Sequence, residues 1–209
     1  MNADQMVNPP KPRPGQVGDI CILLEPHPEQ IMPLRLFQEK LSLQTGGKIH
    51  HTLHFTVQRF TLQSNEIEKN LFRNLQEVLT PIKPFPILTN NMVSYEHPYW
   101  HSRLLRWEIL LTPTLIEFVK RIETGLVASG ITPHFQSRYG FFPTMMTALE
   151  NVPDMTLDSI LDQYEFPLYL FTAYQVVISK ILGLNEFEIL GQFSLRDSAE
   201  PQIDFESIA

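Results

Sequence analysis

Hydrogen-bonding side chains alternate with apolar ones along residues 49–60. If this segment is an extended strand, successive side chains point to opposite faces of a sheet. One face then carries a row of polar side chains: His50, Thr52, His54, Thr56 and Gln58. The other face carries a mostly apolar set: Ile49, His51, Leu53, Phe55, Val57 and Arg59. An imidazole beside a hydroxyl can hold an oxyanion and move protons near neutral pH. The polar row therefore predicts an acid–base or anion-binding site, whereas His51 is expected to be buried.

Hydrophobic periodicity predicts the elements that must position this row. Strands are expected at 17–25, 49–60, 85–95, 103–111, 141–152, 168–182 and 187–195, and helices at 28–43, 64–79, 112–130 and 156–164. Ser64, Thr112 and Thr156 are the expected helix caps. Each half of the chain reads as helix, strand, helix and two strands. The order predicts an α+β fold of two similar lobes, in which antiparallel sheets line a central cleft and helices lie outside.

The composition is that of a globular protein with a real core, since 43% of the 209 residues are apolar and 19% are charged. We expect a flexible N-terminal segment at 1–17, a single bilobal domain at 18–196 and an acidic tail at 197–209. The absence of a secretory signal and of a run of eighteen apolar residues predicts a cytoplasmic protein that does not bind membranes.

Charge and motif content exclude several function classes. The net charge of −7 argues against general binding to duplex DNA. The single cysteine, Cys21, cannot form an internal disulfide, and no Cys/His pattern has zinc spacing, so no metal is expected. No mononucleotide-binding glycine loop or dinucleotide fingerprint is present, so no cofactor is expected and ATP-dependent ligation of the usual kind is not supported.

The run His50-His51-Thr52-Leu53-His54-Phe55 resembles the 2H phosphoesterase superfamily, which includes RNA-ligase-like and cyclic nucleotide phosphodiesterase proteins. In that superfamily each of two lobes supplies a His-x-Thr/Ser motif to a central cleft, and the first motif commonly reads His-x-Thr-Leu-x-Phe. A second match, His54-Phe55-Thr56-Val57, fits the shorter form, and both matches remain open. On one continuous strand the two histidines would lie about 13 Å apart. Their rings are expected to project into a solvent-filled groove between the lobes.

The second motif departs from the pattern Pro-His-x-Thr-Leu. The corresponding strand reads Phe142-Pro143-Thr144-Met145-Met146-Thr147. Aligning Thr147 with the motif hydroxyl puts Met145 at the histidine position, and aligning Pro143 puts Thr144 there. Upstream, Pro133-His134 offers a Pro-His with Gln136 or Ser137 in place of the hydroxyl, but the residues that follow are typical of a loop. A second catalytic histidine would then have to reach the cleft from a loop, as His134, His97 or His101 could. His134 is the predicted one, because His97 and His101 flank a turn where a structural role is favoured.

The resemblance implies metal-independent cleavage of a phosphodiester, with one histidine as base, another as acid, and hydroxyls on the phosphate oxygens. The predicted catalytic residues are His50, His54 and His134. The predicted substrate-binding residues are Thr52, Thr56, Thr144, Thr147, Arg138 and Tyr139, of which Arg138 and Tyr139 are chosen because they adjoin His134.

Two functional hypotheses follow. The first is an enzyme that hydrolyses or binds cyclic or 2′-5′ phosphodiesters of nucleotides or RNA ends. The second is a non-catalytic protein of the same fold that binds a nucleotide-like ligand or a protein partner. The intact row from His50 to Thr56 favours the first hypothesis, and Met145 favours the second. The sequence leaves the substrate and the oligomeric state open.

Overall fold

The structure is a computed structural model that describes residues 14–62, 65–135, 145–154, 157–184 and 186–195. Its elements are, in order, β1 (Ile20–Pro26), α1 (Pro28–Thr45), β2 (Lys48–Ile49), β3 (Phe55–Phe60), α2 (Asn65–Leu79), β4 (Phe85–His97), β5 (Ser102–Ile109), α3 (Pro113–Ala128), β6 (Met145–Glu150), α4 (Asp158–Leu161), β7 (Leu168–Gly183) and β8 (Glu186–Ser194). Thr112 caps α3 as predicted, because its hydroxyl accepts a hydrogen bond from the Leu115 N–H at 3.2 Å. The predicted caps Ser64 and Thr156 lie outside the described residues.

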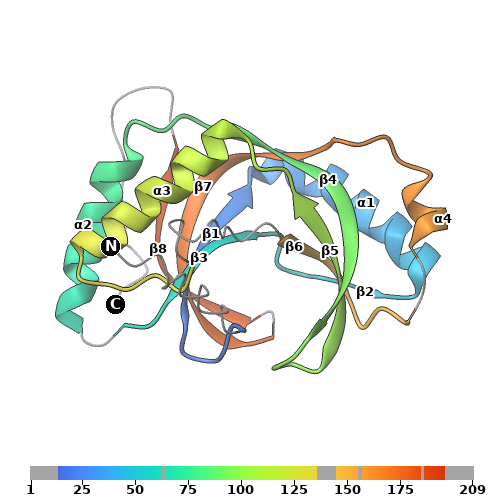
Figure 1. The fold of residues 1–209 in the computed structure, drawn as a ribbon, viewed down its shortest axis with the longest axis horizontal. Helices are drawn as coiled ribbons and strands as arrows, with labels where there is room; N and C mark the ends of the chain where they lie inside the picture. Colours follow the sequence, from blue (N-terminus) through green and yellow to red (C-terminus); the bar gives the residue numbers. More distant parts are fainter. Residues whose placement is uncertain (1–13, 63–64, 136–144, 155–156, 185, 196–209) are drawn as a thin grey trace, which may run out of the picture.

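The described strands form one antiparallel sheet in the order β2-β6-β5-β4-β7-β1-β3, and β8 also pairs with β7. The predicted α+β class with antiparallel pairing is confirmed. The long strand β7 joins the two halves of the sheet: residues 168–173 pair with β4, whereas 173–180 pair with β1 and 175–183 with β8. The predicted lobes therefore share one continuous sheet (Figure 1).

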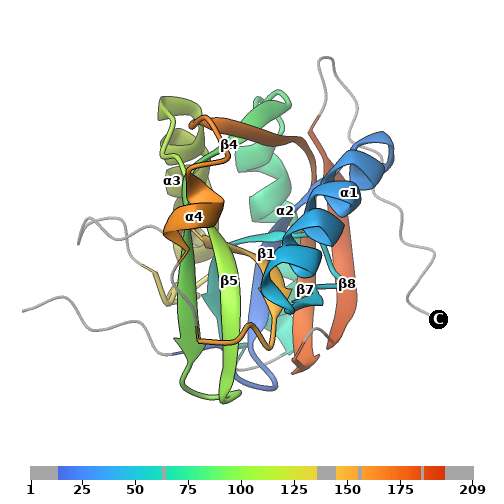
Figure 2. The same ribbon diagram turned by 90° about the vertical axis from the view of Figure 1, so that its right-hand side faces the viewer.

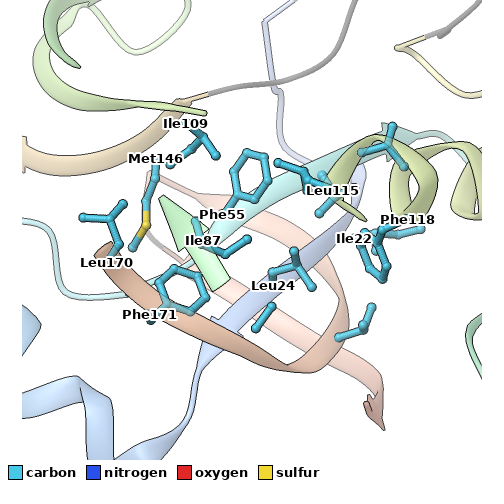
Figure 3. Packing of buried hydrophobic residues seen from close by; sticks show 14 of the residues in the cluster. Ile22, Leu24, Phe55, Ile87, Ile109, Leu115, Phe118, Met146, Leu170 and Phe171 are labelled. Carbon is cyan, nitrogen blue, oxygen red and sulfur yellow. The ribbon is translucent and has the colours of Figure 1, made fainter. Parts of the chain in front are cut away.

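The helices cover one face of this sheet, with α2 and α3 over one half and α1 and α4 over the other (Figures 1 and 2). The main core lies between the helices and the sheet. It joins residues such as Leu71 of α2 and Phe118 of α3 to Ile22 of β1 and Trp107 of β5, all buried, and Figure 3 shows a part of it. Full burial of each large apolar side chain contributes about 2 kcal/mol. No helix among the described residues is long and apolar enough to cross a membrane.

The opposite face of the sheet, here called the inner face, is concave beneath the arch of strands in Figure 1. Its residues alternate with core residues along the strands, because adjacent side chains of a strand point to opposite faces. The inner face is lined by Cys21, Leu23, Thr56, Arg59, Arg106, Thr147 and Val177. Cys21, Leu23 and Val177 form a small apolar cluster against which Trp100 and Phe187 pack.

Candidate active site

The segment 49–60 is broken into two strands, so the prediction of one continuous strand is wrong. β2 pairs with β6, whereas β3 begins at Phe55 and pairs with β1. Side chains of α1 hold the connection between them. The buried Gln38 amide donates to the carbonyls of His50 at 3.3 Å and Ala148 at 2.7 Å. Arg35 donates to the carbonyls of His50, at 2.6 Å, and of His51. These contacts come from side chains of the preceding helix, and the alternation of polar and apolar residues within 49–60 could not predict them.

The break brings two imidazoles together. The ring centroids of His50 and His54 lie 5.6 Å apart, not the 13 Å expected for a continuous strand. His51, which was expected to be buried, is exposed, since the connection does not follow strand alternation. Each ring of the pair is fixed through Nδ1: that of His50 lies 2.6 Å from Glu150 Oε1, and that of His54 lies 3.0 Å from the Thr52 carbonyl.

Both partners of the pair are acceptors, so each Nδ1 donates its hydrogen. In the neutral rings the two Nε2 atoms are then left as proton acceptors. Nε2 of His50 is buried and has no hydrogen-bond partner within the part of the chain that is described. The pair thus presents two basic nitrogens whose orientation is set by Glu150 and by the Thr52 carbonyl.

Burial keeps these imidazoles neutral. Desolvation lowers the pKa of His50 although the adjacent Glu150 raises it. Desolvation, with smaller contributions from His50 and Arg106, lowers the pKa of His54 to about 3. His50 and His54 are only 5% and 9% exposed, and Phe187 lies edge-on to the His54 ring at 5.0 Å. The rings are therefore buried and do not face an open, solvent-filled groove as predicted.

A β-bulge in β3 places an arginine on the inner face. Ile22 pairs with Gln58 but Leu23 pairs with Thr56, so β3 has one extra residue at this point. Thr56 opposite Leu23 and Arg59 opposite Cys21 then point to the same face, since paired residues share a face. The sequence pattern wrongly put Arg59 with the apolar set because it assumed unbroken alternation.

Arg106 of β5 is a central charge that the sequence analysis missed. It is the cross-strand partner of Thr147 on β6. Its guanidinium lies over the Tyr95 ring at 4.4 Å, and its Nε is buried with no hydrogen-bond partner among the described residues. Burial lowers the pKa of Arg106 to about 10. The available signal was an arginine within the apolar run Leu104-Leu105-Arg106-Trp107.

His97, at the end of β4, is set up as a hydrogen-bond donor. Its Nδ1 accepts the N–H groups of Tyr99 and Trp100, each at 3.3 Å, so Nε2 of the neutral ring carries the hydrogen. Burial and the charges of Arg106 and Arg59 lower the pKa of His97 to about 4. The structural role predicted for His97 fits these backbone contacts. Both arginines are also close enough to the ring to affect its pKa.

The remaining predicted residues are dispersed. The backbone N–H of His134 donates to the Arg59 carbonyl at 2.8 Å, and its Nε2 lies 3.4 Å from the Thr61 hydroxyl. The described contacts thus place His134 beside Arg59 and Thr61, at the end of β3 away from His54. Thr56 and Thr147 lie on the inner face, and Thr52 contributes its carbonyl. The predicted binding residues Arg138, Tyr139 and Thr144 lie outside the described residues.

The assembled groups suit an anionic ligand. Arg106 and Arg59 offer positive charge and Thr56 and Thr147 offer hydroxyl donors, while the two neutral imidazoles can accept protons from a bound group. Guanidinium and hydroxyl groups are common ligands of phosphate oxygens. Among the described residues no group of three His, Cys, Asp or Glu side chains could hold a metal ion.

Comparison with known proteins identifies the fold. No protein-family profile and no curated protein matches the sequence. Several crystal structures match the fold. Apo E. coli LigT has a TM-score of 0.59 at 12% identity, covering 88% of this chain and 100% of that chain. A phosphoesterase has a TM-score of 0.56 at 14% identity, covering 87% and 100%. The protein TT0787 of Thermus thermophilus has a TM-score of 0.56 at 14% identity, covering 85% and 98%.

LigT structures complexed with 3′-AMP, ATP and NADP+ are also among the matches. At identities of 11 to 14% these matches show the fold, and they confirm at that level the resemblance to 2H phosphoesterases.

Proposed function

We propose that this protein binds phosphodiesters of nucleotides or RNA ends on the inner face of its sheet and hydrolyses 2′,3′-cyclic or 2′-5′-linked ones. The observation that carries the proposal is the histidine pair, His50 and His54, whose rings lie 5.6 Å apart within the field of Arg106. The match to LigT, which binds nucleotides in several crystal structures, supports the same ligand class.

In this proposal the two imidazoles differ in role because their partners differ. Glu150 favours the protonated form of His50, whereas the partner described for the His54 ring is the Thr52 carbonyl, which carries no negative charge. His54 is therefore the base and His50 the acid. With centroids 5.6 Å apart, the two rings can reach two oxygens of one phosphoryl group.

For a cyclic phosphate, the reaction starts with His50 protonated at Nε2, a form that Glu150 and the bound phosphate favour. His54 takes a proton from water while the water oxygen bonds to phosphorus. The bond from phosphorus to one ribose oxygen breaks, and His50 donates its proton to that oxygen. A phosphomonoester is formed, and transfer of a proton from His54 to His50 restores the enzyme. Arg106 and the inner-face hydroxyls neutralise the non-bridging oxygens. Each acid–base partner contributes roughly 10² to 10⁴ in rate.

The substrate must reach groups that packing covers. Phe187 lies against the His54 ring, and Trp100 packs on the inner-face cluster of Cys21 and Leu23. The proposal therefore requires one of these aromatic side chains to move when a ligand enters.

The test is hydrolysis of adenosine 2′,3′-cyclic phosphate and of a 2′-5′-linked dinucleotide. His50→Asn and His54→Asn should each lose roughly 10²-fold or more of the wild-type rate. His51→Asn is the matched control, because His51 is exposed and adjoins the pair. Equal activity of wild type and both pair variants would exclude catalysis by these histidines.

A second candidate function is non-catalytic binding of a nucleotide-like ligand. The observation that favours it is Met145, which occupies the β6 position where the resemblance expects a histidine and pairs with Glu108. Titration of the wild type with 3′-AMP, together with the hydrolysis assay, separates the two functions. Binding without turnover of either substrate would select the second.

A further inference from the structure

The inner face holds a positive charge, that of Arg106, which no carboxylate within the described part of the chain neutralises. No ion pair between Arg106 and a carboxylate occurs among the described residues, and its Nε is buried without a hydrogen-bond partner. The one close contact described for its guanidinium is the face of Tyr95, at 4.4 Å. A desolvated guanidinium with an unused donor is costly unless an anion completes the site.

The surroundings of Arg106 point to a ligand rather than to a structural partner. Burial and the nearby charge of Arg59 disfavour its protonated form, and Arg106 in turn lowers the pKa values of His50, His54 and His97. His50 adds a second buried nitrogen without a partner in the described part of the chain, its Nε2. Unused donor and acceptor atoms on neighbouring side chains mark a place where a bound group can make several hydrogen bonds at once.

The position of Arg106 also relates it to the altered motif. Its cross-strand partner is Thr147, the hydroxyl that the resemblance places in the second motif. Side chains of directly paired residues lie about 5 Å apart at Cβ and share a face. Met145, two residues before Thr147, carries neither charge nor donor. This half of the sheet thus offers a guanidinium beside a hydroxyl in place of an imidazole beside a hydroxyl.

We infer that Arg106 and Thr147 form the phosphoryl-binding half of the site, while the second half, His50 and His54, carries the acid–base groups. The ligand is a phosphate oxyanion, whose oxygens match the forked N–H groups of a guanidinium. The inference rests on the proposed function only for the nucleotide part of the ligand. Phosphate binding itself does not require cleavage.

The test is calorimetric titration of the whole protein with inorganic phosphate and with 3′-AMP. Arg106→Met should weaken both by roughly ten- to hundredfold, as expected for loss of a charge-assisted hydrogen bond. Arg103→Met is the matched control: it removes the same charge from the same strand, but Arg103 is ion-paired with Asp154. It should change affinity less than twofold. Arg106→Lys should restore part of the affinity, because it keeps the charge but not the fork.

Thermal unfolding separates a binding role from a structural one. Removal of an unneutralised arginine should leave the melting temperature of ligand-free Arg106→Met unchanged or higher, while the rise caused by phosphate is lost. A lower melting temperature with unchanged phosphate affinity would overturn the inference. Equal weakening by Arg103→Met would also overturn it, because the effect would then be one of overall charge.

If Arg106→Met does not fold, the wild-type protein decides the question. The Nε–H resonance of Arg106, identified by its absence from Arg106→Lys, should shift when inorganic phosphate is added, and a fixed resonance would refute the inference. Phosphate binding without hydrolysis would refute the proposed enzyme activity and leave this inference intact. If the wild type and Arg106→Met hydrolysed the substrates at the same rate, the enzyme proposal would stand and this inference would be refuted.

Discussion

Acid should destabilise this protein through His54. In the unfolded chain an imidazole has a pKa near 6.5, whereas burial beside His50 lowers the pKa of His54 to about 3 in the folded state. The folded state therefore favours the neutral ring. The stability that this provides is complete above pH 6.5 and is lost as the pH falls toward the folded pKa, because the unfolded chain binds the proton first.

The size of the effect follows from the window between the two pKa values. From about pH 7.5 to about pH 5 the unfolded chain takes up a proton that folded His54 does not. At pH 5 the solution is about 1.5 pH units below the unfolded pKa of 6.5. At about 1.4 kcal/mol per unit, the free energy of unfolding should therefore be lower by about 2 kcal/mol. His50 and His97 act with the same sign, since their pKa values are also lowered. The charged groups that act on these rings are Glu150 and the arginines Arg106, Arg59 and Arg35.

Urea unfolding at both pH values isolates the contribution of His54. His54→Asn keeps an amide donor for the Thr52 carbonyl but removes the titrating ring, so its loss of stability on acidification should be about 2 kcal/mol smaller than that of wild type. His51→Asn, at an exposed position, should behave as wild type. Identical acid sensitivity of His54→Asn and wild type would refute the reasoning, as would an NMR titration of His54 with a midpoint near 6.5.

Three further predictions concern the contacts that hold the histidine pair. Glu150→Gln removes the group that raises the pKa of His50, so kcat for cyclic phosphate hydrolysis at neutral pH should fall by roughly 10²-fold. An unchanged kcat would exclude His50 as the acid. Gln38→Leu should lower the free energy of unfolding in urea by about 2 kcal/mol, because it removes two buried hydrogen bonds, one of the two that each of the His50 and Ala148 carbonyls accepts. Phe187→Ala should raise the pKa of His54 toward its ordinary value by admitting water, as an NMR titration can show; Ile189→Ala, an exposed change on the same strand, should not.

Most elements could be predicted from the sequence because their signals are local. The apolar periodicity at 85–95 and 103–111 predicted β4 and β5 to within two residues at each end, and Thr112-Pro113 marked the start of α3. The prediction of one continuous strand at 49–60 was wrong because contacts with other elements decide its structure. Gln38 and Arg35 hold the connection between β2 and β3, and the register with β1 creates the bulge before Arg59. A period of two in one segment contains no information about such partners.

The candidate site also contains residues that the sequence could predict and residues that it could not. His50, His54 and Thr56 could be found because they stand within one short motif. Glu150 could not, since its role depends on the pairing of β2 with β6, which brings it to His50 across a hundred residues. Arg106 was missed because an arginine in a strand has meaning only once the face it occupies is known.

The arrangement has a consequence for how acid–base roles can be divided. Here both rings come from one connection, while β6 and β5 supply the carboxylate of Glu150 and the guanidinium of Arg106. Glu150 contacts one ring, while Arg106 lowers the pKa values of both. In the proposed mechanism Glu150 therefore distinguishes acid from base before any ligand binds, and neutralisation of Arg106 by a phosphate should raise the pKa values of both rings.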